Sequence, residues 1–275
     1  MKTIHVIPST SNGAYEQGFY LNRSTMTLIP DQAFVNEKGE FLFETNSFGL
    51  RGAEPEEGQP IVVIWGDSVV FSMPGRGWPE QMNDDSPAYL FLNGGVEGTS
   101  FAEILKRAVA FNRKRRVELN VILPGWHHFP DNRYMQGDLE NALGEIPNAV
   151  LATQPTSLNA QIASADLTST FRQTLEDETH FAFWGAAPYS VQLQTAYFAY
   201  ICQRNAIVRA VAQSSGTPLI DLFAALDSST LEDFRKHFFD IGHPRMIAYP
   251  MIAKIMREEL QPLLKASPAR TAAAS

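Results

Sequence analysis

Short runs of consecutive apolar residues recur along the chain, and many of their side chains are β-branched or aromatic. The first run is Ile61-Val62-Val63-Ile64-Trp65, which holds no charged residue and so predicts a strand that is buried on both faces. Four later segments have a comparable pattern. The strands predicted in this way cover residues 61–65, 89–93, 117–123, 180–184 and 218–222.

Apolar residues at helical spacing separate these strands. Ser100 and Glu103 form a capping-box signature at the start of one such segment, and apolar residues from Phe101 to Val109 then share one helix face. Further helices are predicted at 191–214 and 247–264. Strands that alternate with helices predict a doubly wound α/β fold with a mainly parallel sheet.

The pattern also divides the chain into parts. The first part is extended and rich in loops, and the apolar stretches 33–35 and 40–43 on either side of Asn36-Glu37-Lys38-Gly39 predict a hairpin. After the third strand, glycines and prolines interrupt short helical pieces, which indicates a helical insertion. The expected parts are an arm at 1–58, a core domain at 59–264 with an insertion at about 130–177, and a disordered tail at 265–275.

Composition narrows the class of protein. A chain of 275 residues with 44% hydrophobic residues can bury a sizeable core. Its formal net charge of −8 disfavours nucleic acid as a partner. The one concentrated basic run, Arg113-Lys114-Arg115-Arg116, lies at a predicted helix end, where it suits the helix dipole and is typical of a solvated terminus. The single cysteine, Cys202, excludes an intrachain disulfide, and the N-terminus lacks a long apolar stretch, so we expect a cytoplasmic protein without a membrane span.

Two short motifs bear chemistry. Gly66-Asp67-Ser68 follows the first predicted strand, where open α/β sheets place their ligands, beyond the carboxyl ends of the strands. Asp240 and His243 stand three residues apart near the other end of the chain. Each motif alone is typical of a turn or of a helix start. Together they supply a candidate nucleophile, a base and a carboxylate that orients the base.

These motifs resemble those of the SGNH hydrolases, also called GDSL-like esterases and lipases. The resemblance runs from about residue 46 to about residue 264. It implies a flavodoxin-like, three-layer α/β/α fold with a mainly parallel five-stranded sheet. The segments that carry it are Gly66-Asp67-Ser68-Val69-Val70-Phe71, Asn93-Gly94-Gly95-Val96-Glu97-Gly98-Thr99 and Phe239-Asp240-Ile241-Gly242-His243-Pro244.

The resemblance also implies roles for single residues. Ser68 takes the place of the nucleophile, His243 that of the base, and Asp240 that of its orienting carboxylate. In the second segment an aligned glycine lends its N–H to the oxyanion hole, and we expect this glycine to be Gly95. The chain departs from the family pattern at His127, which stands where the family has an asparagine that donates to the oxyanion. A neutral imidazole keeps one N–H, so His127 can still donate.

His127, His128 and Asp131 also invite interpretation as metal ligands. Adjacent residues of an extended segment point to opposite sides, so the two histidines would not readily share an ion. We therefore expect neither a metal nor a cofactor.

The segment Asn46-Ser47-Phe48-Gly49-Leu50-Arg51-Gly52 resembles one that precedes the first core strand in a bacterial branch of SGNH-like proteins. Arg51 either lines the cleft or is buried and ties loops together, and we favour the second interpretation.

The function expected from these residues is hydrolysis of an O-acyl ester of a carbohydrate or small metabolite, with acetyl as one candidate acyl group. An acyltransferase that uses the same serine is one alternative. A catalytically silent SGNH-like domain that only binds a glycan or a protein is another, and the altered third motif is its main support. The expected partner is thus a small-molecule or glycan ester, without nucleic acid or membrane.

Overall fold

The computed structural model places the larger part of the chain. The residues that it describes are 2–8, 20–85, 88–125, 132–156, 191–226, 231–238 and 241–266.

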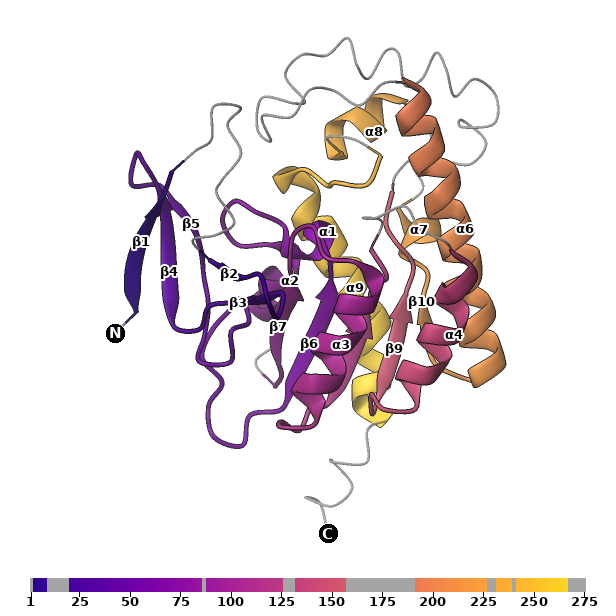
Figure 1. Ribbon diagram of the computed structural model, residues 1–275, viewed down its shortest axis with the longest axis horizontal. Helices are drawn as coiled ribbons and strands as arrows, with labels where there is room; N and C mark the ends of the chain where they lie inside the picture. The colour runs from indigo at the N-terminus through magenta and orange to yellow at the C-terminus, as the bar shows by residue number, and fades with distance from the viewer. Residues whose placement is uncertain are drawn as a thin grey trace.

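A five-stranded sheet forms the centre of the molecule (Figure 1). Its strand order is β10-β9-β8-β6-β7, and all neighbouring strands pair in parallel. This order places the first core strand, β6, inside the sheet and the second, β7, at its edge. The strands are β6 (Ile61–Gly66), β7 (Leu90–Gly95), β8 (Leu119–Ile122), β9 (Ala149–Ala152) and β10 (Leu219–Ile220).

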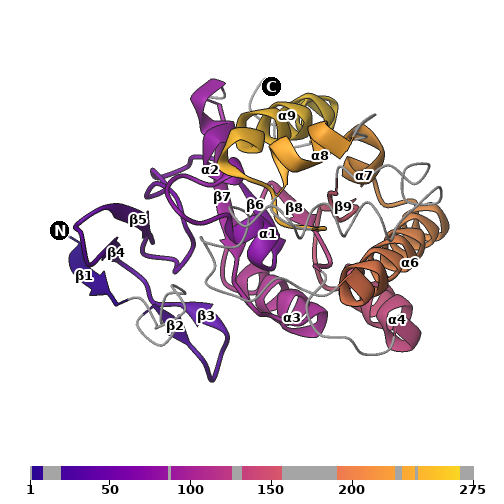
Figure 2. The same cartoon turned by 90° about the horizontal axis from the view of Figure 1, so that it is seen from above.

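Helices cover both faces of this sheet (Figure 2). Side chains of β6 alternate between the two: Val62 and Ile64 enter the core beneath α9, whereas Val63 and Trp65 enter the core beneath α3. The three-layer α/β/α fold with a five-stranded parallel sheet is therefore confirmed. The α-helices are α1 (Ser68–Phe71), α2 (Trp78–Gln81), α3 (Phe101–Asn112), α4 (Asn132–Leu143), α6 (Val191–Ser215), α7 (Leu222–Ala225), α8 (Leu231–His237) and α9 (Tyr249–Ala266), and the 3₁₀ helices are η2 (Met82–Asp85) and η4 (Met246–Ala248).

The part after the third strand needs a correction. An insertion was expected at about 130–177, yet the described part of this range, 132–156, supplies α4 and the sheet strand β9. Pro147 and Asn148 precede β9, so what looks like a break in helical pattern is the turn into a short buried strand. The stretch 180–184, expected to be the fourth strand, lies outside the described residues, as do residues 267–275 of the expected tail.

A second, smaller sheet forms the N-terminal arm beside β7. Strands β4 and β5 pair antiparallel, which confirms the predicted hairpin, and β1 adds to β4 in parallel. Their shared core includes Phe71 at the end of α1 and Val96 just after β7, so the arm is anchored on the carboxyl ends of two core elements. The strands of the arm are β1 (Thr3–Ile7), β2 (Leu21–Asn22), β3 (Thr27–Leu28), β4 (Gln32–Asn36) and β5 (Phe41–Glu44).

No helix in the described ranges is both long and apolar enough to cross a membrane.

The capping box expected at the start of α3 is present. Ser100 Oγ accepts the Glu103 N–H, and the Glu103 carboxylate accepts the Ser100 N–H at 2.6 Å. These bonds satisfy two of the N–H groups that the first turn of a helix leaves without intrahelical acceptors.

Replacement of Ser100 by alanine tests this interaction. We expect Ser100→Ala to lower the free energy of unfolding by about 1 kcal/mol, because the Glu103 N–H loses its acceptor. Urea unfolding measures the change, and Ser214→Ala at the exposed end of α6 serves as control. Equal stability of the two variants would show that the capping box contributes nothing.

Candidate active site

Ser68 lies on the turn that leaves the central strand β6. Asp67 is the N-cap of α1, and its Oδ1 accepts the Val69 N–H at 3.0 Å. The helix folds back so closely that a Cβ on Gly66 would lie 2.2 Å from Val70 Cγ2. Only glycine fits at that position, and this close approach holds Ser68, which is 6% exposed, at the carboxyl end of the sheet.

His243 meets Ser68 from the other end of the chain. Ser68 Oγ and His243 Nε2 lie 2.8 Å apart, although 175 positions separate the two residues. His243 is half-buried, and the loop that carries it is closed by the bridge between Phe238 and Pro244. A hydroxyl within hydrogen-bonding distance of an imidazole nitrogen is the arrangement required for proton transfer from a serine nucleophile.

Of the other expected site residues, only Gly95 lies in the described part of the chain. Asp240 and His127 lie outside the described residues, and so do His128 and Asp131 of the metal interpretation. Gly95 is described, and its N–H donates to Asn93 Oδ1 at 2.9 Å. A Cβ on Gly95 would lie 2.2 Å from the backbone nitrogen of Phe71, so this glycine faces α1. The role of oxyanion donor expected for Gly95 stays a prediction, and it would require this N–H to exchange Asn93 Oδ1 for the substrate oxygen.

Two buried arginines hold the strand ends around Ser68. Arg107 of α3 donates to the carbonyl oxygens of Gly94 at 2.6 Å and Gly66 at 3.0 Å. Arg204 of α6 donates to the carbonyl oxygens of Pro124 at 3.1 Å and Gly125 at 2.7 Å. The carboxyl ends of β6, β7 and β8 are thus fixed by side chains from two helices.

Arg107 and Arg204 also place positive charge near the turn that carries Asp67 and Ser68. Burial lowers the pKa of Arg107 to about 10 and also lowers the pKa of Arg204. The negative charge of Asp67 acts on both guanidinium groups in the opposite direction. The buried Asp67 carboxylate therefore has two cations near it, and both remain protonated at neutral pH. Sequence reasoning missed them, although a basic residue amid the sheet-facing positions of the helix 101–112 was a signal for Arg107.

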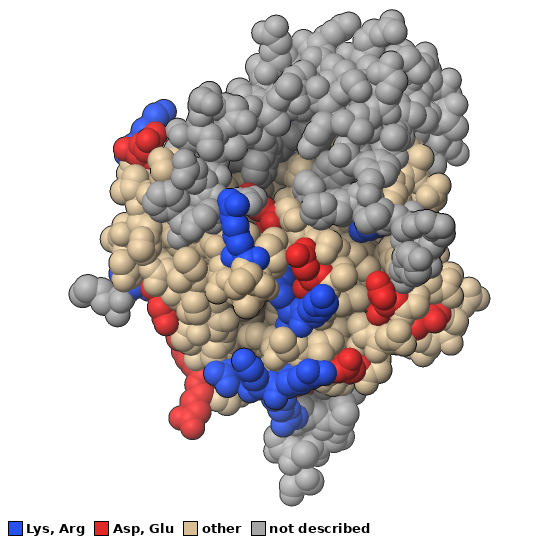
Figure 3. All heavy atoms as spheres, in the orientation of Figure 1, with Lys and Arg blue, Asp and Glu red and all other residues tan. Residues whose placement is uncertain are grey.

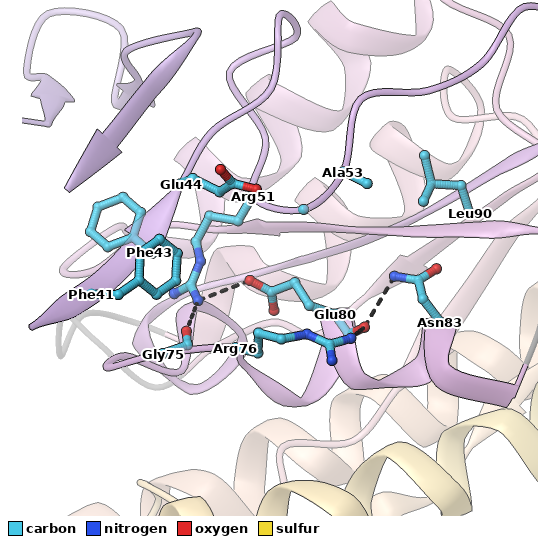
Figure 4. A pocket seen from close by; sticks show the side chains of 11 residues that line it. Phe41, Phe43, Glu44, Arg51, Ala53, Gly75, Arg76, Glu80, Asn83 and Leu90 are labelled. Atoms are coloured by element: carbon cyan, nitrogen blue, oxygen red, sulfur yellow. Dashed lines mark hydrogen bonds and ion pairs between the residues drawn. The ribbon is translucent and has the colours of Figure 1, made fainter. Parts of the chain in front are cut away.

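Arg51 is buried beneath the far end of α1. Its guanidinium donates to the carbonyl oxygens of Phe71 and Gly75, and Nη2 lies 2.9 Å from Glu80 Oε1. It also lies over the rings of Phe43, at 5.1 Å, and Phe71, at 4.7 Å. Figure 4 shows Arg51 reaching from the arm toward Gly75 and Glu80 along the wall of a cavity of about 310 Å³. The structure supports the interpretation that Arg51 ties loops together.

Asn93 extends this network to β7. Its Nδ2 donates to Glu80 Oε2 at 3.0 Å and to the Phe71 carbonyl oxygen at 3.3 Å. The last carbonyl of α1 therefore accepts from both Arg51 and Asn93. A single helical turn is unstable by itself, so these contacts hold the helix that begins with Ser68.

Double-mutant measurements test the buried ion pair. We expect Arg51→Met to lower the free energy of unfolding by about 3–5 kcal/mol, because it leaves the Glu80 carboxylate buried without its cation. Adding Glu80→Gln to Arg51→Met should restore part of this loss, so the two single costs should exceed the cost of the double variant. Urea unfolding of all four proteins measures the coupling. Strictly additive costs would mean that the two charges do not stabilise each other.

Comparison with known proteins agrees with this fold. No family model and no curated protein matches the chain. Among solved structures, a lipase/acylhydrolase from Enterococcus faecalis superposes with a TM-score of 0.50 at 15% identity, over 74% of this chain and 96% of that one. The acetylxylan esterase Axe2 from Geobacillus stearothermophilus superposes with a TM-score of 0.51 at 13% identity, over 74% and 94%. LAE5, an α/β hydrolase from the metagenome of Lake Arreo, gives 0.50 at 15% identity, over 74% and 95%. The chain therefore has the fold of these hydrolases.

Proposed function

We propose that this protein is a serine ester hydrolase with Ser68 as nucleophile. The observation that carries the proposal is the 2.8 Å distance between Ser68 Oγ and His243 Nε2 at the carboxyl end of the parallel sheet. Ligands bind at this end of open α/β sheets, and similar folds belong to an acylhydrolase and an acetylxylan esterase.

The reaction has two halves. Ser68 Oγ attacks the ester carbonyl while its proton passes to His243 Nε2, and a tetrahedral intermediate with a negatively charged oxygen forms. The intermediate collapses when the bond to the alcohol oxygen breaks and that oxygen takes the proton from His243. Water then attacks the acyl-enzyme while its proton passes to His243, and a second tetrahedral intermediate forms. It collapses when the bond to Ser68 Oγ breaks and that oxygen takes the proton from His243, which releases the acid and restores the enzyme. Asp240, three residues before His243, is our candidate for the carboxylate that orients the imidazole.

The oxyanion needs hydrogen-bond donors. The Ser68 N–H belongs to the first residue of α1, so no intrahelical carbonyl can accept it. We assign it as one donor, because it sits beside the hydroxyl whose attack creates the charge. His127, which stands where SGNH hydrolases have a donating asparagine, is our candidate for the second. For the substrate we propose an O-acyl ester, with an acetyl ester of a carbohydrate as the first candidate.

Replacement of Ser68 tests the proposal. We expect the protein to hydrolyse p-nitrophenyl acetate, and Ser68→Ala to lower kcat by on the order of a thousandfold or more, because the covalent route is lost. The thermal unfolding midpoint should change little, and Ser214→Ala should retain full activity. If Ser68→Ala kept the activity of the unmodified protein, another group would have to be the nucleophile.

Product analysis after an alcohol is added to the reaction distinguishes hydrolysis from acyl transfer. If transfer to the alcohol exceeded hydrolysis, the acyltransferase alternative would replace the one proposed.

A further inference from the structure

A groove of about 570 Å³ runs between α3 and the β2–β3 hairpin. This volume falls in the range of small-molecule sites. Lys106 and Lys114 line it on the side of α3, and Ser24, Thr25 and Thr27 line it on the side of the hairpin.

Lysine and arginine side chains line this groove, and no aspartate or glutamate does so in the described part of the chain. Both Lys106 and Lys114 are exposed, and among the described residues neither ammonium group lies within 4.0 Å of a carboxylate. Figure 3 shows lysine and arginine side chains gathered over α3 and its C-terminal end, on a protein whose formal net charge is −8. Two cations without a carboxylate partner in the described ranges, at separate points of one groove, favour a negatively charged ligand.

Arg107 adds a buried cation to the wall. It is 7% exposed and lines the groove, and its Nε has no hydrogen-bond partner among the described residues. Its other nitrogens are used by the carbonyl oxygens at the strand ends. A ligand with a negative charge would lower the cost of keeping this guanidinium buried.

The remaining lining is mostly apolar, with aromatic rings on one side and hydroxyl groups on the hairpin. Phe48 and Phe111 are half-buried and lie edge to face with 5.9 Å between ring centroids, and Arg115 covers Phe48 at 4.8 Å. Across the groove, Thr25 Oγ1 and Thr27 Oγ1 lie 2.7 Å apart. Apolar side chains, hydroxyl groups and ammonium groups together match a ligand with an apolar surface, hydroxyls and negative charge. An anionic sugar has all three.

The groove reaches the carboxyl end of β7. Gly94, Gly95 and Val96 line it, and Gly95 pairs with Gly66 in the sheet, two residues before Ser68. We propose that the groove binds an anionic saccharide and, resting on the proposed function, that this saccharide is the alcohol part of the ester.

Binding to the Ser68→Ala protein tests the assignment without turnover. The probes for isothermal titration calorimetry are trigalacturonate, a sulfated galactotriose, galactose 1-phosphate and neutral galactotriose. We expect at least one anionic probe to bind about tenfold or more tightly than galactotriose, a difference equivalent to about 1.4 kcal/mol. The probe that binds identifies the anionic group as carboxylate, sulfate or phosphate.

Paired charge removals locate the site. Lys106→Gln with Lys114→Gln should weaken binding of that probe by about tenfold or more, because two ammonium groups are lost from the groove. Lys254→Gln with Lys265→Gln removes the same charge from α9 and should change Kd by less than about twofold. Equal losses in the two pairs, or no binding of any anionic probe, would overturn the assignment.

The two proposals can fail separately. If the native protein bound an anionic probe but hydrolysed no ester, the groove would stand and the esterase proposal would fall. If it hydrolysed p-nitrophenyl acetate but bound no anionic probe, only the groove assignment would be overturned.

Discussion

The close return of α1 onto the ends of β6 and β7 is the constraint on which the site depends. The backbone of this one-turn helix packs against Gly95 and its Val70 side chain packs against Gly66, so a side chain on either glycine would collide with α1. This contact fixes the position of Ser68 at the carboxyl end of the sheet. Packing that is this tight allows little relaxation, so the hydroxyl is positioned before any substrate arrives.

Buried cations on opposite sides of α1 support that contact. Arg51 and Asn93 bind the last carbonyl of the helix, while Arg107 binds carbonyl oxygens of the two strands that the helix covers. Strand ends at an open site lose their ladder partners, and a buried carbonyl oxygen without a donor is costly. Guanidinium groups solve this problem because each offers five N–H donors. Arg107 also lies close enough to the Asp67 carboxylate for the two charges to interact.

Helices and strands that depend on residues adjacent in the sequence were predictable. Strands and contacts that depend on residues distant in the sequence were harder to predict. The run 61–65 predicted β6 because a continuous apolar stretch needs burial on both faces, and Ser100 predicted the start of α3 through its own side chain. By contrast, β9 is four residues long, and it is a strand because β8 and β10 pair with it. Local pattern cannot show such pairing. The sequence also could not show that the Gly95 N–H donates to Asn93 Oδ1, because that contact depends on how the glycine-rich turn packs against α1. Arg51 likewise could be interpreted in two ways until Glu80 and Phe71 were known to surround it.

The central claim is that folding activates one hydroxyl, that of Ser68, by bringing His243 to it. Reaction with a fluorophosphonate followed by peptide mass spectrometry tests this claim most directly, because the reagent modifies nucleophilic serines. We expect one adduct, on Ser68, that forms in the native protein, forms far more slowly in His243→Ala, and is absent after denaturation in urea. An adduct on a different serine, or equal labelling of native and denatured protein, would contradict it.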